Sequence, residues 1–171
     1  MKIFVQGLWY CGCVISACLA SLKNNVTAYD DNKRIVNKLK KNITPIFEPN
    51  LKELIRTSTK AGNLTFVHNL KKLNSSNIIW FAYDTPVNEY DQANTKYVLD
   101  KIKNTLKKLK SNKYVIISSQ LPVGTINILE RYSKNILMKK FYFYCCPENL
   151  RLGNSLSSFL HAERMVIGYR N

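Results

Sequence analysis

Glycine and proline are scarce in this sequence, which has six glycines and five prolines in 171 residues. A collagen-like repeat or a low-complexity linker would need many more of both, so these classes are excluded. With 46% hydrophobic and 22% charged residues, the composition is that of a folded globular chain and not of a disordered segment or a coiled coil. We therefore expect each glycine and proline to mark a particular turn, in a chain that forms a single domain.

Acidic residues are also few, with 11 Asp and Glu against 26 Lys and Arg, which gives a net charge of +15. This excess, mostly lysine, favours solubility and attracts polyanions, but it does not specify a fold. One alternative is therefore a basic protein that binds nucleic acid or an acidic surface through the lysines at 33–41 and 101–113. Solvated helix faces explain these lysines more simply, and no aromatic stacking motif accompanies them, so we expect no nucleic-acid partner.

Cysteine is present in an odd number, at Cys11, Cys13, Cys18, Cys145 and Cys146. The last two are adjacent and cannot easily bridge each other, so a disulfide framework is not expected. A zinc site needs two ligand pairs at suitable spacing, and the two distant histidines do not complete one with the first cysteines. The sequence predicts no metal site, and reduced thiols in a cytoplasmic protein.

A long uninterrupted apolar run is missing as well. Residues 3–22 carry no charge, but Gln6, Gly7, Gly12 and Ser16 interrupt them, so they do not suit a membrane span. The stretch at 15–18 does resemble a lipoprotein cleavage box, which leaves an exported protein as an alternative. The same residues are better used as a strand, a turn and a helix, and we expect no membrane partner.

Hydrophobic periodicity predicts a βαβ unit at the N-terminus, with a strand at 2–6, a turn at 7–12, a buried helix at 13–22 and a second strand at 26–30. Alternation continues to the end of the chain. Further strands are expected at 64–67, 78–83, 114–118, 141–145 and 165–167, and further helices around 35–39, 51–57, 98–109 and from 122–125 onward. This order predicts an α/β fold, a Rossmann-like doubly wound and mostly parallel sheet with helices on both faces.

Ligands of such sheets bind beyond the carboxyl ends of the strands. Gly7 and Gly12 follow the first strand, where a glycine turn and a helix N-terminus can hold a pyrophosphate. Asp30 lies 18 residues after Gly12, at the end of the second strand, where a carboxylate can accept hydrogen bonds from a ribose. Glycine turns and strand-end aspartates are common, so these residues alone leave a purely structural role open.

Motifs after the later strands are more specific. The chain contains Glu48-Pro49, Thr85-Pro86, Pro122-Val123-Gly124-Thr125, Pro147-Glu148-Asn149-Leu150-Arg151 and Val166-Ile167-Gly168, in this order. On these motifs it resembles the N-terminal NAD-binding domain of the UDP-glucose/GDP-mannose dehydrogenases, oxidoreductases that oxidise the sugar alcohol of a nucleotide sugar to a uronate. The resemblance extends over all 171 residues.

The resemblance implies NAD as cofactor, in preference to NADP because Asp30 would repel a 2′-phosphate. The implied cofactor-binding residues are Gly7, Tyr10, Cys11, Gly12, Asp30, Arg34, Thr85, Ser119 and Gln120. Glu148 is the one implied catalytic residue, where family members manage water during hydrolysis of a covalent thioester, and a carboxylate at a strand end can act as a general base. A helix-capping role for Glu148 remains the alternative.

Four positions depart from the family pattern. Trp9 replaces the middle glycine of the turn, where an indole would obstruct NAD unless the turn is reshaped. Asp84 replaces a glycine and adds negative charge close to the expected phosphates. Gln120 replaces a threonine, and Ile35 replaces a basic residue for which Arg34 is a neighbouring substitute. These departures keep a second hypothesis open, a degenerate Rossmann module that no longer binds NAD.

Only the cofactor-binding part of the family is present in residues 1–171, which we expect to form one NAD-binding domain. The family's central helix and C-terminal sugar-nucleotide domain, with its nucleophilic cysteine, have no counterpart here. Cys145 and Cys146 do not match that nucleophile and are expected to be packing residues. A UDP-sugar is therefore expected as a partner only through a second half, this chain alone is not expected to complete the oxidation, and a homodimer is left open.

Overall fold

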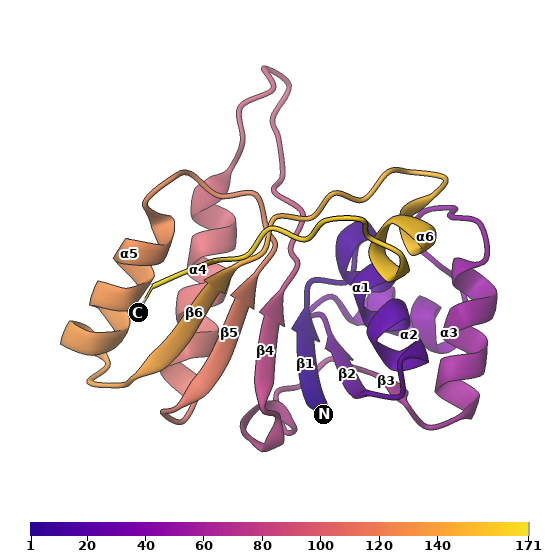
Figure 1. Cartoon of the computed structure of the whole chain (residues 1–171), viewed down its shortest axis with the longest axis horizontal. Coiled ribbons are helices and arrows are strands. Elements are labelled where there is room, and N and C mark those ends of the chain that lie inside the picture. Colours follow the sequence, from indigo (N-terminus) through magenta and orange to yellow (C-terminus); the bar gives the residue numbers. More distant parts are fainter. Residues whose placement is uncertain (171) are drawn as a thin grey trace.

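A single sheet runs through the computed structural model, which describes residues 1–170 (Figure 1). Seven strands lie side by side in the order β3-β2-β1-β4-β5-β6-β7, and all neighbours are parallel except β6 and β7, which are antiparallel. The strands are β1 (Lys2–Gln6), β2 (Asn25–Tyr29), β3 (Leu64–Val67), β4 (Ile78–Phe81), β5 (Lys113–Ile117), β6 (Phe141–Cys145) and β7 (Gly168–Tyr169). This strand order confirms the predicted doubly wound fold, and the winding reverses between β1 and β4.

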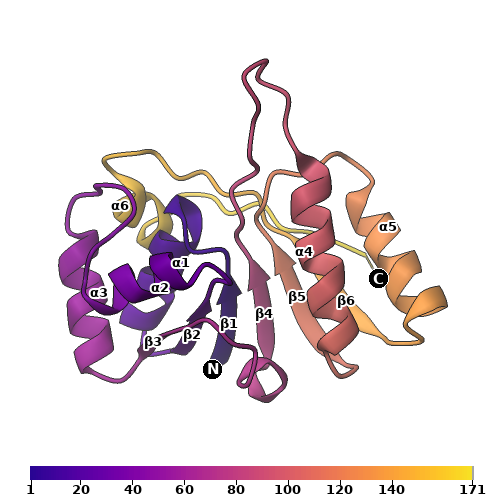
Figure 2. The same cartoon turned by 180° about the vertical axis from the view of Figure 1, so that it is seen from behind.

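Helices cover both faces of the sheet. One face carries α1 (Tyr10–Ser21), α2 (Lys33–Lys40), α3 (Leu51–Lys60) and α6 (Ser155–Leu160), and the other carries α4 (Thr95–Lys108) and α5 (Thr125–Arg131) (Figures 1 and 2). Two short elements complete the list, a 3-10 turn at Leu73–Ser75 and a π-helical turn at Tyr132–Ile136 that continues α5. No helix within residues 1–170 is both long and apolar enough to span a membrane.

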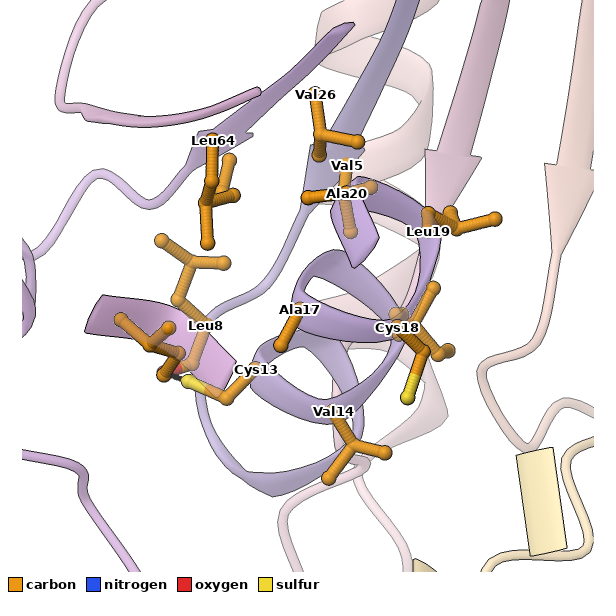
Figure 3. Packing of buried hydrophobic residues seen from close by; sticks show 14 of the residues in the cluster. Val5, Leu8, Cys13, Val14, Ala17, Cys18, Leu19, Ala20, Val26 and Leu64 are labelled. Carbon is orange, nitrogen blue, oxygen red and sulfur yellow. Dashed lines mark hydrogen bonds between the residues drawn. The ribbon is translucent and has the colours of Figure 1, made fainter. Parts of the chain in front are cut away.

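The core consists of two apolar clusters, one on each face of the sheet, because successive side chains of a strand point to opposite faces. On β1, Ile3 and Val5 pack against the α1 face, whereas Phe4 packs toward α4. Figure 3 draws the small side chains Ala17 and Cys18 of α1 together with Val5 of β1, which all belong to one buried cluster. Nine of the twelve α1 residues are buried, so this helix is fixed beneath the centre of the sheet.

The predicted strand at 165–167 is wrong. Met165, Val166 and Ile167 are about half exposed and outside any strand, and the final pairing is the two-residue β7, which runs antiparallel to β6. The predicted helix at 13–22 begins earlier, because α1 starts at Tyr10, directly after the glycine turn. Helix α6 was not predicted.

Candidate functional site

The loops that follow β1, β2, β4, β5 and β6 all emerge at one edge of the sheet, where the carboxyl ends of the parallel strands lie (Figure 1). After β4 the chain forms a long projection, residues 84–94, which we call the arm. A bridge between Val87 and Ala93 holds its two sides together. The loops that carry the predicted site residues therefore lie together at this edge of the sheet, close to the N-terminus of α1.

The glycine turn after β1 is tightly packed against the neighbouring chain. Gly7 has φ +91° and its N–H donates to the Tyr29 carbonyl at 3.0 Å. A Cβ added to Gly7 would lie 2.7 Å from Cδ1 of Tyr83, and one added to Gly12 would lie 1.6 Å from the Gly7 carbonyl oxygen. Both positions therefore exclude any side chain, which brings the first turn of α1 directly against the end of β1.

The N-terminus of α1 carries no side-chain cap. Trp9 occupies the N-cap position with φ −82°, a conformation that does not require glycine, and its side chain is about half exposed. No acidic residue lies in the first turn of the helix. The Cys11 amide faces the Asp84 carboxyl, and no side chain caps the other backbone N–H groups of this turn, so they can hold an anion as helix N-termini do.

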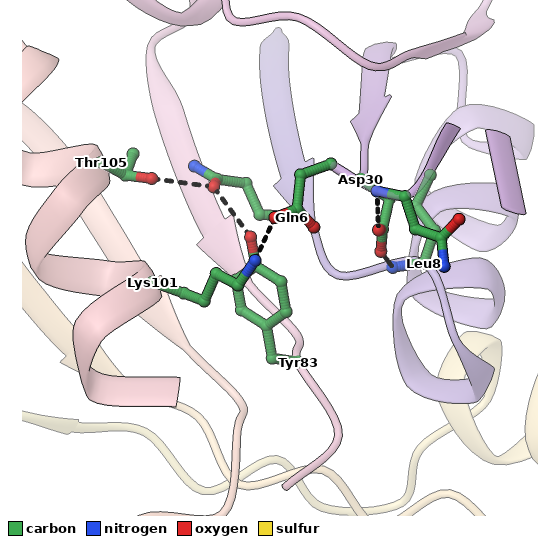
Figure 4. Close-up of polar contacts among 8 residues, drawn as sticks. Gln6, Leu8, Asp30, Tyr83, Lys101 and Thr105 are labelled. Atoms are coloured by element: carbon green, nitrogen blue, oxygen red, sulfur yellow. Dashed lines mark hydrogen bonds and ion pairs between the residues drawn. The ribbon is translucent and has the colours of Figure 1, made fainter. Parts of the chain in front are cut away.

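Asp30 is 7% exposed at the end of β2, and both of its carboxylate oxygens are engaged. Oδ2 accepts from the Leu8 N–H at 2.8 Å, as Figure 4 shows, and Oδ1 accepts from the Asn32 N–H, also at 2.8 Å. Burial raises the pKa of Asp30, although these two amides act in the opposite direction. Each oxygen keeps a free lone pair, so the carboxylate can still accept from a hydroxyl group.

Two predicted residues in the first turn of α1 have different surroundings. The Tyr10 hydroxyl donates to Glu48 at 3.1 Å, so this side chain points to the α3 side and not to the sheet edge. Burial, with the nearby carboxylates of Asp84 and Glu148, raises the pKa of the Cys11 thiol well above its ordinary value. Cys11 is therefore a neutral thiol near physiological pH and not an activated nucleophile.

The loops after β4 and β5 are joined to each other. The Thr85 hydroxyl donates to the Gln120 carbonyl at 2.8 Å, so Gln120 contributes through its backbone and its side chain is exposed. Ser119 is 8% exposed, and its Oγ has no hydrogen-bond partner among the described residues. A buried hydroxyl without a partner is expected to bond to something the protein alone does not supply.

Glu148 lies on the loop after β6. Its Oε2 accepts from the Leu150 N–H at 2.8 Å, and its side chain lines a cavity of about 970 Å³ between the ends of β4 to β6 and residues 147–165. Arg34, by contrast, is exposed in the first turn of α2, where its backbone N–H donates to the side chain of Asn32 at 3.0 Å. The structure thus brings most of the predicted residues to one edge, with Tyr10 turned aside.

Sequence reasoning missed three polar features of this region. Glu48 is buried and connects α1 to the segment before α6. The Glu48-Pro49 motif in the sequence was the available signal for this residue. Gln6 is fully buried beneath α4, where its Oε1 accepts from Tyr83 at 3.3 Å and from Thr105 at 3.0 Å (Figure 4). A glutamine inside an apolar strand is the sequence signal for this cluster of Gln6, Tyr83 and Thr105.

The third feature is a chain of hydrogen bonds across the carboxyl ends of β4, β5 and β6. The Trp80 indole N–H donates to the Ser118 hydroxyl, and this hydroxyl donates to the Cys146 carbonyl.

The family model described as the UDP-glucose/GDP-mannose dehydrogenase family, NAD binding domain, matches residues 1–171. A UDP-glucose 6-dehydrogenase of Bacillus subtilis is 33% identical in an alignment of 171 positions that covers 98% of this chain and 39% of that protein. One of Rickettsia typhi is 31% identical and covers 100% of this chain and 39% of its own length. The chain thus spans about two fifths of these relatives.

Solved structures show the same fold. A UDP-D-ManNAc dehydrogenase from Pyrococcus horikoshii superposes with a TM-score of 0.90 at 24% identity, over 99% of this chain and 41% of that one. A GDP-mannose dehydrogenase from Pseudomonas aeruginosa, solved as a ternary complex, gives a TM-score of 0.90 at 22% identity, over 100% and 41%. At these identities the likeness concerns the fold alone.

Proposed function

The chain belongs to the UDP-glucose/GDP-mannose dehydrogenase family as its NAD-binding domain, and from this premise we propose that it holds the cofactor of a nucleotide-sugar 6-dehydrogenase. NAD would lie along the carboxyl edge of the sheet. The observation that supports this placement best is the uncapped N-terminus of α1 behind a glycine turn that admits no side chain. When bound, NAD supplies the acceptor for the hydride removed from the sugar alcohol.

The residues at this edge fit a dinucleotide. Gly7 and Gly12 bring the backbone N–H groups of α1 to the edge, where they can hold a pyrophosphate. Asp30 keeps free lone pairs for ribose hydroxyls, and Ser119 offers a buried hydroxyl without a partner. Trp9 is about half exposed and its backbone conformation does not require glycine, which supports a turn at which NAD can still bind.

The complete oxidation would need residues beyond this chain, since the relatives are much longer. We propose that a UDP-sugar reaches the nicotinamide end of the site from a second part of the enzyme, and that Glu148 holds or activates the water used there. A cytoplasmic location agrees with the five cysteines, which are all unbridged thiols. A homodimer would show directly in the mass of the purified chain by light scattering.

The proposal predicts that the purified chain binds NAD and prefers it to NADP. The Asp30 carboxylate would repel the 2′-phosphate of NADP, so we expect NADP to bind at least about tenfold more weakly. Isothermal titration calorimetry with both dinucleotides measures this ratio. Asp30→Asn should narrow it, whereas Asp91→Asn, which removes an equal charge from the exposed tip of the arm, should leave it unchanged.

Absence of NAD binding would contradict the proposed function. If millimolar NAD gives neither heat nor a shift in the thermal unfolding temperature, at any pH at which the chain is folded, the proposed function is wrong. The chain would then be a degenerate module that keeps the fold without the cofactor.

A further inference from the structure

Asp84 is the first residue of the arm, and it places a carboxyl group at the first turn of α1. Its neighbours come from two other elements, with Cys11 and Cys13 on α1 and Glu148 on the loop after β6. The Oδ2 atom is buried and has no hydrogen-bond partner among the described residues. An acidic oxygen without a partner thus lies beside the amides that would hold the pyrophosphate.

The surroundings of Asp84 oppose a negative charge. Burial raises the pKa of its carboxyl, and the Glu148 carboxylate adds to this effect. The amides of Asp84 and Cys11 and the Cys11 thiol act in the opposite direction without offsetting burial. The largest effects on this carboxyl come from burial, the two amides, Glu148 and Cys11, and none of them comes from a lysine or an arginine, despite the net charge of +15.

A bound pyrophosphate would make this position still less favourable for an anion. Two like charges a few ångströms apart in a partly buried site repel strongly, because the effective dielectric constant there is far below that of water. A protonated carboxyl removes that repulsion and offers an O–H donor to a phosphate oxygen. The neutral acid is therefore the form of Asp84 that is compatible with the ligand.

We propose that Asp84 is a cofactor-binding residue that enters the NAD complex as a neutral acid, so that NAD binding takes up one proton at this carboxyl. This inference rests on the proposed function. The proton comes from solvent and adds to a carboxylate oxygen, and no other bond forms or breaks. NAD affinity consequently rises as the pH falls toward the range in which free Asp84 is already protonated, and below that range it levels off.

Calorimetric titration with NAD tests the proposal, between about pH 6 and about pH 8.5 and in two buffers of different ionisation enthalpy at each pH. The difference in heat between the buffers counts the protons taken up. We expect uptake to approach one proton at the alkaline end, and the apparent Kd to rise by up to about tenfold for each pH unit there.

Asp84→Asn keeps the shape of the side chain without its charge. It should bind NAD more tightly than the unmodified chain at alkaline pH, with the same affinity at every pH and no proton uptake. Asp84→Gly, which restores the residue expected from the family, should behave likewise and serves if the asparagine variant is unfolded. Asp91→Asn, as the matched control, should keep the pH dependence of the unmodified chain.

Failure of this inference and failure of the proposed function can be told apart. NAD binding without proton uptake and with a constant Kd would overturn the role of Asp84 while leaving the cofactor site intact. Uptake that persists in Asp84→Asn but disappears in Glu148→Gln would overturn it too, because Glu148 would then be the group that titrates. No NAD binding by the unmodified chain or by either Asp84 variant would overturn the proposed function.

Discussion

Single residues account for both the predictable and the unpredictable parts of the site. Gly7, Gly12 and Asp30 could be found from the sequence because their roles depend on chain geometry after a strand, which spacing reveals. The missing hydrogen-bond partners of Asp84 Oδ2 and Ser119 Oγ could not be found, because they depend on side chains from three different loops. Sequence spacing does not say which of these side chains meet.

Gly12 offers a direct test at this scale. Gly12→Ala would place a Cβ 1.6 Å from the Gly7 carbonyl oxygen, and neither the strand end nor the buried helix has room to move. We expect a loss of about 3 kcal/mol or more in the free energy of unfolding, measured by urea denaturation.

Gly168→Ala is the matched control, because its added Cβ would meet Cys145 at 3.7 Å, an ordinary contact. This variant should change the free energy of unfolding by less than about 0.5 kcal/mol. Equal stability of the two variants would show that the turn after β1 is less tightly packed than described.

At the level of elements, hydrophobic periodicity placed the sheet correctly but not every boundary. The central strands β1, β2 and β4 are buried on both faces, whereas β3, β5 and β6 alternate buried with more exposed residues, and both patterns are easily recognised. The start of α1 was missed because Trp9 provides no capping signal, and α6 was missed because a six-residue segment with three serines has no clear period. β7 has only two residues, too few for any pattern.

Glu48 connects three elements through one buried carboxylate. It accepts from the N–H groups of Gly153 at 2.8 Å and Ser155 at 2.9 Å and from the Tyr10 hydroxyl. Burial raises the pKa of Glu48, but these donors outweigh burial and lower it overall. The carboxylate thus fixes the start of α6 against α1.

Glu48→Gln should therefore destabilise the chain by roughly 2 kcal/mol at neutral pH, because two amides lose a charged acceptor. A lowered pKa in the folded state adds stability above the ordinary value of 4.5, and this stability is lost as the pH falls through the folded pKa. The difference between variant and unmodified chain should shrink in urea denaturation at acidic pH.

Glu53→Gln removes an exposed carboxylate that pairs with Arg56 on the same helix, and it should leave the free energy of unfolding nearly unchanged at any pH. A pH-independent loss in Glu48→Gln, or an equal loss in both variants, would contradict the role given to Glu48.

For the molecule as a whole, the main unfavourable feature is its excess of positive charge, which few ion pairs among the described residues neutralise. The net charge is +15, and within residues 1–170 only three ion pairs form. Lys38, Lys40 and Lys41 are among the exposed lysines near α2, so self-repulsion should lower the stability of the folded chain at low ionic strength.

We expect the thermal unfolding temperature to rise by about 2–4 °C when NaCl is raised from about 0.02 M to about 0.5 M, since screening weakens this repulsion. Differential scanning calorimetry measures the change. Replacing Lys38, Lys40 and Lys41 by glutamine should reduce the rise, and an unfolding temperature that does not respond to salt would show that the positive charges are too widely spaced to matter.

The arm joins β4 to α4, and its residues 86–94 are all exposed. The β4–β5 pairing and the cluster that contains Phe4, Phe81 and Val115 lie beneath it and do not depend on it. Covalent continuity at the arm is therefore not what unites the two sides of the molecule. The same domain can in principle be assembled from two separate polypeptides, one that ends in the arm and one that begins in it. The β4–β5 pairing and the shared apolar cluster would then hold the two polypeptides together.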